Sequence, residues 1–236
     1  MSAAALNEQS PLFAAAETPL PSLAAYDDVV AGIDVGGVRK GFHAVALQRG
    51  QVVGTFTHAV PAVVAAWCID TGACAVAVDA PCRWSAAGRS RAAERDLRAE
   101  GIQAFATPSF VTACAKPFYR WMINGADLYV RLEPHYVLFD GGAPAARMCL
   151  ETYPQAVACA LATRLLSAKE KRANRRAVLS QAGIDIRRLT NIDLVDAALC
   201  AVAAAYVRAG RYRAYGDRDE GKIFVPGRRA ITRRAA

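Results

Sequence analysis

An α/β fold, in which helices flank a mixed sheet, is the architecture that the sequence predicts. Three short apolar runs at residues 29–35, 42–47 and 51–58 are separated by turn residues, which predicts a three-stranded antiparallel meander. The continuous apolar run at 74–79 is typical of a buried parallel strand. The long apolar segment at 191–209 predicts a helix that packs across this sheet.

Helices are expected between the strands. Pro61 opens a short helix at 62–69, because proline is tolerated in a first turn. Residues 82–146 are rich in Arg, Gly, Pro and aromatic residues, and they are too many for a plain loop. A mainly helical insertion is therefore expected there, with helices near 90–99 and 118–132.

The second half of the chain supplies the remaining elements. A strand at about 147–152 precedes a helix at 154–166 and a second helix that ends at Gly183. A short strand at 222–225 follows the long apolar helix. A single domain over residues 29–227 is therefore expected.

Both ends of the chain are expected to lie outside this domain. Residues 1–28 are Ala-rich, contain three prolines and show no clear period, which predicts a loose N-terminal tail or a partly ordered arm. Residues 228–236 carry four arginines and predict a basic C-terminal tail.

The composition favours an acidic partner and a cytoplasmic location. The 236 residues carry a net charge of +8, and 24 of the 29 basic residues are arginines. Arginine suits phosphate, so nucleic acid is favoured as a partner, although a biased genome gives the same composition. The seven cysteines show no C-x-x-C pair, and a reducing cytoplasm fits them best. No apolar stretch is long enough to suggest a membrane span, and no basic N-terminal region suggests a secretory signal.

Acidic residues stand at the ends of predicted strands and at the start of the last long helix. Asp34, Asp79 and Glu151 belong to strands, and Asp193 and Asp196 lie in the first turns of the helix. Acidic side chains are poor strand formers and are costly to bury alone, so their convergence on one site is the simplest explanation. Clustered carboxylates repel one another unless divalent cations lie between them, and oxygen ligands select Mg²⁺ or Mn²⁺.

The order of these elements resembles the RNase H-like superfamily of nucleases. More closely, several motifs are similar to domain-of-unknown-function family 429, described as predicted nucleases, and the resemblance runs over about residues 29–226. The motifs are Gly32-Ile33-Asp34-Val35-Gly36, Val76-Ala77-Val78-Asp79-Ala80-Pro81, Gly88-Arg89-Ser90 with Glu94-Arg95-Asp96-Leu97-Arg98, Glu151-Thr152-Tyr153-Pro154, Asp196-Ala197-Ala198-Leu199-Cys200-Ala201 and Glu220-Gly221-Lys222-Ile223.

The resemblance implies that the protein hydrolyses phosphodiesters with two Mg²⁺ or Mn²⁺ ions. It implies that Asp34 bridges both metals, that Asp79 and Glu151 each hold one side, and that Asp196 closes the site. Asp193 is the competing helix ligand, because residues three apart share a helix face.

Each acidic residue also has a structural interpretation. Asp34 could hold a glycine-rich turn, and Asp79 could initiate a turn before a proline. Glu151 and Asp193 could each favour the positive end of a helix. Glu220 is best interpreted as an exposed loop residue, although it could extend the site.

Basic residues near the motifs are candidates for substrate binding. Lys40 follows a Gly-Gly turn, where it could touch a phosphate or lie at a solvated hairpin tip. In the insertion, cations and aromatic rings occur together, which suits a nucleic-acid backbone and its bases, or else a partly apolar helical cover. These residues are Arg83, Arg89, Arg91, Trp84 and Tyr119. The three histidines His43, His58 and His135 are interpreted as structural, and none is expected to act as a general base.

Two other functions remain open on the sequence alone. The glycine turn after Asp34 also resembles the first phosphate motif of the sugar kinase and actin-like ATPase superfamily, which would make the protein a phosphotransferase. Alternatively, the chain is a non-catalytic nucleic-acid-binding module of the same fold. The choice between DNA and RNA, and the existence of a homodimer, are also left open.

Overall fold

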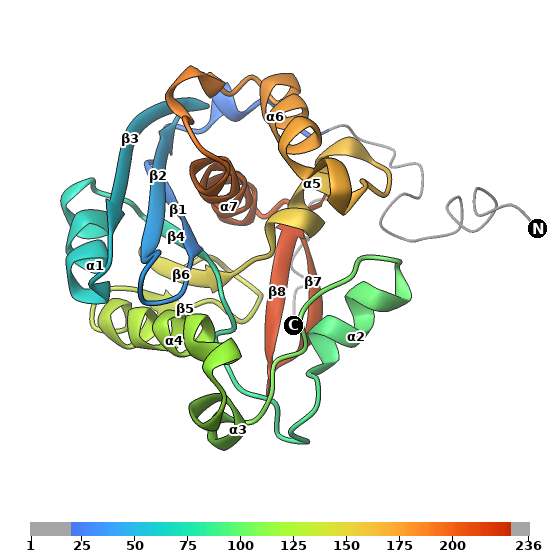
Figure 1. The fold of residues 1–236 in the computed structure, drawn as a ribbon. Coiled ribbons are helices and arrows are strands. Elements are labelled where there is room, and N and C mark those ends of the chain that lie inside the picture. Colours follow the sequence, from blue (N-terminus) through green and yellow to red (C-terminus); the bar gives the residue numbers. More distant parts are fainter. Residues whose placement is uncertain (1–19, 228–236) are drawn as a thin grey trace, which may run out of the picture.

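A computed structural model describes residues 20–227 of the chain, and it contains an eight-stranded mixed sheet flanked by helices (Figure 1). The strands are β1 (Val30–Val35), β2 (Phe42–Gln48), β3 (Gln51–His58), β4 (Ala75–Asp79), β5 (Val137–Leu138), β6 (Met148–Glu151), β7 (Tyr212–Asp217) and β8 (Gly221–Pro226). The α-helices are α1 (Pro61–Asp70), α2 (Ala92–Ala99), α3 (Phe110–Ala115), α4 (Arg120–Leu132), α5 (Pro154–Ala162), α6 (Lys171–Gln181) and α7 (Ile192–Arg208). Short 3₁₀ helices cover Leu23–Ala25, Pro117–Tyr119, Ala168–Glu170 and Ile186–Arg188.

The strand order is β3-β2-β1-β4-β6-β8-β7, with β5 paired to β6. Strands β1, β2 and β3 form the antiparallel meander that the sequence predicts. Strands β1, β4, β6 and β8 run parallel to one another. The mixed α/β sheet, with a meander and parallel strands, is thus confirmed. The parallel strands end at one edge of the sheet, as is usual for open α/β ligand sites.

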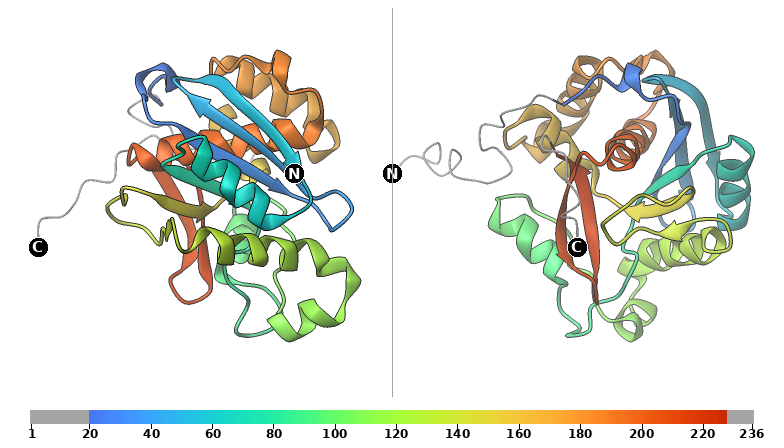
Figure 2. Two further views of the ribbon diagram at one scale, coloured as in Figure 1. Left: turned by 90° about the vertical axis from the view of Figure 1, so that its left-hand side faces the viewer. Right: turned by 180° about the vertical axis from the view of Figure 1, so that it is seen from behind.

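Helices cover both faces of the sheet. Helix α7 lies against β1, β2 and β4, with α5 and α6 outside it, whereas α1 and α4 pack together on the opposite face (Figures 1 and 2). Two separate hydrophobic cores follow from this arrangement. We call the two sides of the sheet the α7 face and the α4 face.

Strand residues alternate between these faces. In β1, Val30 packs in the α7 core, whereas Ala31 and Ile33 pack in the α4 core. Alternation places Gly32 and Asp34 on the α7 face. A Cβ atom at Gly32 would lie only 2.0 Å from the backbone nitrogen of Ala201, so glycine lets α7 lie directly on β1.

The part of the N-terminal segment that the structure describes, residues 20–28, contacts the rest of the domain. Leu23 is 2% exposed within the α7 core. The hydroxyl of Tyr206 donates a hydrogen bond of 2.9 Å to the carbonyl oxygen of Pro21. Residues 1–19 and the basic tail expected at 228–236 lie outside the described residues.

Other elements differ in detail from the sequence-based expectations. The insertion is mainly helical, but it also contains α3 and the short strand β5. Strand β7 was not expected, and α5 ends at Ala162, before Thr163 with φ +54°. Within residues 20–227, no helix is long and apolar enough to cross a membrane.

Candidate functional site

Two aspartates lie side by side at the edge of the sheet where β1 and β4 end. Asp34 and Asp79 occupy paired positions of these parallel strands, and alternation places both on the α7 face. Asp34 is 7% exposed, and its Oδ2 atom is buried without a hydrogen-bond partner in the described part of the chain. Burial, together with the charge of Asp196, raises the pKa of Asp34 to about 7. Burial and the charge of Asp34 also raise the pKa of Asp79 well above its ordinary value.

Helix α7 brings two more aspartates to this pair. The side chain of Asn191 accepts a 2.8 Å hydrogen bond from the backbone N–H of Leu194, which starts the helix at the site. Asp193 lies in the first turn, where the positive helix end favours an anion, and Asp196 lies almost one turn later. The two aspartates form ion pairs with different residues.

Asp193 faces Asp34, and Lys40 lies between them and solvent. The Nζ atom of Lys40 donates a 2.6 Å hydrogen bond to Oδ1 of Asp193, and it lies 4.0 Å from Oδ2 of Asp34. Burial lowers the pKa of Lys40, but the bond to Asp193 and the charge of Asp34 outweigh it and raise that pKa. Lys40 is therefore a counter-ion of the acidic pair rather than an unpaired residue at a hairpin tip.

Asp196 is neutralised by Arg175, a buried residue of α6. Nη1 of Arg175 donates to Oδ1 of Asp196, and Nη2 donates to the side-chain oxygen of Gln155 at 3.1 Å. Burial raises the pKa of Asp196, although the adjacent guanidinium opposes this shift. Both helix residues therefore lie near Asp34: the charge of Asp196 acts on its pKa, and Asp193 has a carboxylate oxygen within 4.8 Å of it.

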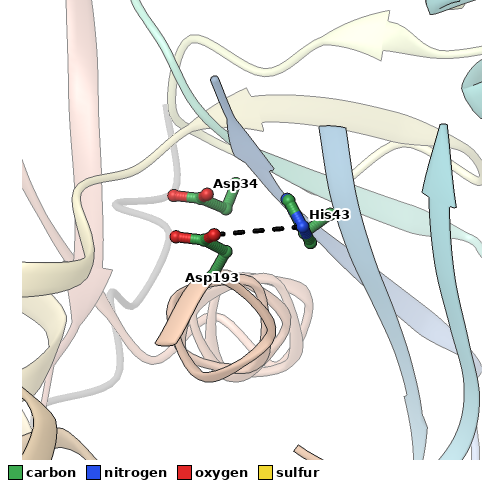
Figure 3. A group of neighbouring side chains, drawn as sticks. All are labelled: Asp34, His43 and Asp193. Atoms are coloured by element: carbon green, nitrogen blue, oxygen red, sulfur yellow. Dashed lines mark ion pairs between the residues drawn. The ribbon is translucent and has the colours of Figure 1, made fainter. Parts of the chain in front are cut away.

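His43 joins this group, although it was expected to have only a structural role. It is paired with Asp34 across β1 and β2, is 8% exposed, and has its Nε2 atom 3.9 Å from Oδ2 of Asp193. Burial lowers the pKa of His43, which favours the neutral imidazole. Figure 3 shows the carboxylates of Asp34 and Asp193 extending in the same direction beside His43. One ligand atom from each of the three lies within 4.8 Å of the others, and we call this group the acidic triad.

Cross-strand pairing is the signal from which the position of His43 beside Asp34 could have been predicted. A tight hairpin after Asp34 pairs the two residues, and paired residues of antiparallel strands project from the same face.

Glu151 lies apart from the triad. Met148 and Leu150 of β6 pack in the α7 core and Cys149 packs in the α4 core, so alternation places Glu151 on the α4 face. Its carboxylate accepts hydrogen bonds of 2.5 and 2.8 Å from Arg91 and one of 2.8 Å from the backbone N–H of Cys82. Glu151 thus lines the same cavity as the four aspartates, but Arg91 and the backbone of Cys82 hold its carboxylate.

Arg91 is also placed differently from the sequence-based expectation. It is 1% exposed, and its guanidinium contacts both Glu151 and Glu94, the latter at 2.7 Å. Its donors are therefore occupied by carboxylates instead of being presented to a substrate. Arg83 and Arg89, the other expected substrate-binding arginines of the insertion, are exposed.

Glu220 is buried, contrary to the expectation of an exposed loop acid. It is 8% exposed and accepts hydrogen bonds from the backbone N–H groups of Ala86 at 2.7 Å and Ala92 at 3.1 Å, and from the hydroxyl of Ser85 at 3.2 Å. These bonds lower the pKa of Glu220 despite the opposing effect of burial. Glu220 therefore fixes the loop between β4 and α2.

A cavity of about 330 Å³ connects these groups. Its wall includes the four aspartates, the Arg91 and Glu151 pair, and the basic residues Lys40, Lys171 and Arg175. Aromatic residues of the insertion, Phe105 and Trp121, complete its rim. The cavity thus combines an acidic floor with basic and aromatic walls.

The donor set is compatible with a divalent cation. The unpaired oxygen of Asp34 and the neutral imidazole of His43 are free to act as ligands, and Asp79 adds a further carboxylate beside Asp34. Carboxylates alone suit Mg²⁺, whereas a set with one imidazole nitrogen also suits Mn²⁺.

Comparison with known protein families assigns the chain to one of them. The family model described as "Protein of unknown function (DUF429)" matches residues 32–220, most of the chain. The protein belongs to this family. The match runs from within β1 to the end of β7 and includes all four aspartates of the cavity, as well as His43 and Glu151. No curated protein and no solved structure matches the chain.

Proposed function

We propose that this member of the DUF429 family is a nuclease that hydrolyses phosphodiesters with divalent metal ions, and that it belongs to the RNase H-like superfamily. The observation that carries the proposal is a pair of buried carboxylates with too few counter-ions. Asp34 and Asp79 are adjacent across two parallel strands, and one oxygen of Asp34 is buried without a partner. When both carboxyl groups are ionised, such an arrangement is costly for the folded protein unless a cation binds there.

The proposed ligands are Asp34, Asp79, Asp193 and His43, with Asp196 adjoining them. A bound Mg²⁺ or Mn²⁺ ion would activate water and neutralise charge on the phosphate. Glu151 is left out of the proposed ligand set, because Arg91 and the backbone of Cys82 already satisfy it.

The chain's own cations have separate roles in this proposal. The exposed amino groups of Lys40 and Lys171 at the cavity rim bind phosphate oxygens. Arg175 holds the carboxylate of Asp196 in one orientation. Burial lowers the pKa of His43, which favours the imidazole form that has a nitrogen lone pair for a cation.

The phosphotransferase alternative receives less support from the geometry. A phosphate-binding turn needs free backbone N–H groups that point at the ligand. In the turn after β1, the N–H of Gly36 donates to the carbonyl of Gly41, and those of Lys40 and Gly41 donate to the carbonyl of Gly37. These three amides are therefore occupied within the turn, which leaves fewer donors there for a phosphate.

The test compares cleavage by the wild type and by Asp34→Asn. Both proteins are incubated with single-stranded, duplex and branched DNA and RNA, in the presence of Mg²⁺, Mn²⁺ or EDTA. We expect metal-dependent cleavage by the wild type and none by the variant, whereas Asp127→Asn, an exposed change on α4, keeps full activity. Equal cleavage by wild type and Asp34→Asn, or none by either, would contradict the proposal. Nucleic-acid binding without cleavage by the wild type would favour the non-catalytic module.

A further inference from the structure

Four aromatic rings of the insertion form a connected surface beside the cavity. The ring centroid of Phe105 lies 5.7 Å from that of Phe118 and 6.4 Å from that of Trp121, and Tyr119 lies 5.0 Å from Phe118. We call these four residues the aromatic surface. Phe105 and Trp121 also line the cavity, so the surface is continuous with the acidic site.

The aromatic surface is open to solvent. Phe105 is 63% exposed and Phe118 is 59% exposed. The rings come from the segment before α3, the 3₁₀ turn Pro117–Tyr119 and the start of α4, which together lie at the end of the molecule away from α5 and α6 (Figure 1). Clustered exposed rings cost free energy in water and mark binding surfaces more often than single exposed apolar residues do.

The charge around these rings is positive. Residues 101–126 contain Lys116 and Arg120, both exposed, and no Asp or Glu. The loop between β4 and α2, which carries the exposed Arg83 and Arg89, lies against this segment, because the backbone N–H of Ser85 donates a 3.1 Å hydrogen bond to the carbonyl oxygen of Pro108. A ligand that complements this surface has planar apolar faces and negative charge.

We propose that the aromatic surface stacks with the unpaired bases of a single-stranded nucleic acid, and that Lys116 and Arg120 contact its phosphates. This inference rests on the proposed function, because the same strand would then lead into the cavity past Phe105 and Trp121. Alternating rings and cations are the means by which proteins hold single strands without sequence preference. A duplex hides its base faces within the stack, so the surface favours single strands over duplexes.

Fluorescence anisotropy of the full-length protein with labelled oligothymidine tests this inference. The measurements are made in EDTA, so that they report binding without metal-dependent cleavage. We expect Phe105→Ala and Phe118→Ala each to weaken binding about fivefold or more, the loss typical of one stacked base. Phe105→Tyr keeps a ring and should retain binding. Val130→Ala serves as the matched control, because Val130 is 60% exposed on α4 but carries no ring.

Charge and strand preference are tested in the same assay. Lys116→Gln should weaken binding to any sequence. It should also reduce the slope of log K against log salt concentration by about one, as expected when one phosphate contact is lost. A duplex of the same length should bind more weakly, and its binding should be insensitive to Phe105→Ala. Melting temperatures of all variants, whose altered side chains are exposed, show that the fold is retained.

Three results would overturn the inference. The first is unchanged oligothymidine binding by both alanine variants. The second is duplex binding that is equally tight and equally sensitive to these changes. The third is a homodimer that Phe105→Ala dissociates without altering oligothymidine binding, which would make the surface an interface between copies of the chain. Where any of these three results is accompanied by metal-dependent cleavage that Asp34→Asn abolishes, the proposed function stands and this inference alone is rejected. Ring-dependent binding without Asp34-dependent cleavage would support this inference and reject the proposed function.

Discussion

On the α7 face of the sheet, Asp34 and Asp79 lie together with too little positive charge to balance them, whereas on the α4 face Glu151 is matched by Arg91. Both faces bury carboxylates at the same edge of the same sheet. The Asp34 oxygen lacks a partner, and the nearest cation, Lys40, is 51% exposed. Glu151 instead receives two hydrogen bonds from an arginine that is 1% exposed. The comparison teaches that a buried carboxylate indicates a cation site only where the chain leaves its charge unbalanced.

The largest expected effect is on the α4 face. Arg91→Met removes the guanidinium from Glu151 and Glu94 and leaves both carboxylates buried without it. We expect the free energy of unfolding in urea to fall by about 3–5 kcal/mol, because breaking a buried ion pair leaves uncompensated charge. The exposed Arg83→Met is the control, with a change within about 0.5 kcal/mol. If the free energy of unfolding of Arg91→Met fell by less than about 1 kcal/mol, the ion pair between Arg91 and Glu151 would not be needed to stabilise the fold.

The next effect is a pH dependence on the α7 face. The pKa of Asp34 in the folded protein, about 7, lies above its ordinary value of 3.8, so the folded state binds this proton more tightly. The stability of the metal-free wild type relative to Asp34→Asn should therefore be greatest below about pH 4 and fall as pH rises to about 7. The expected fall is on the order of 2–4 kcal/mol, measured by urea unfolding in EDTA. A difference that is independent of pH would show that Asp34 is compensated after all.

A smaller effect concerns the choice of metal. His43→Ala removes the only nitrogen ligand of the acidic triad, and imidazole suits Mn²⁺ better than Mg²⁺. We expect the affinity for Mn²⁺ to fall about tenfold and the affinity for Mg²⁺ to fall less, as measured by calorimetric titration. His135→Ala is the control, because His135 is exposed. Equal losses for both ions would remove His43 from the ligand set.

The smallest expected effect is that of the internal counter-ion. Lys40 contacts Asp193 and lies near Asp34, so its ammonium group competes with a metal ion for the same carboxylates. Lys40→Met should raise Mn²⁺ affinity about two- to fivefold, the range of a partly exposed ion pair. A weaker affinity in Lys40→Met would show that the lysine supports the metal site instead of competing with it.

The sequence was sufficient to predict the mixed sheet and the convergence of Asp34 with Asp79. Both follow from where acidic residues interrupt apolar runs, which is a local signal. The face that Glu151 occupies could not be predicted in this way. Strand β6 is buried on both faces, so its apolar residues carry no alternating pattern to show which side is which.

The ion-pair partners of the charged residues could not be predicted from the sequence either. Arg91 is separated by 60 residues from Glu151, and Lys40 by 153 residues from Asp193, so only the tertiary fold brings each pair together. The edge strand β7 was missed because it mixes aromatic residues with Arg213, Gly216 and Asp217, which weakens the strand signal.

Calorimetric titration of the metal-free protein with Mn²⁺ tests the central claim most directly. The wild type, Asp34→Asn and Glu151→Gln are compared. Each variant converts one carboxylate into an amide, and the two changes lie on opposite faces of the sheet. The account predicts that Asp34→Asn weakens binding more than about 100-fold, beyond the effect typical of residues that only orient ligands. It also predicts that Glu151→Gln binds within about twofold of the wild type. Equal losses in the two variants, or unchanged binding in Asp34→Asn, would contradict it.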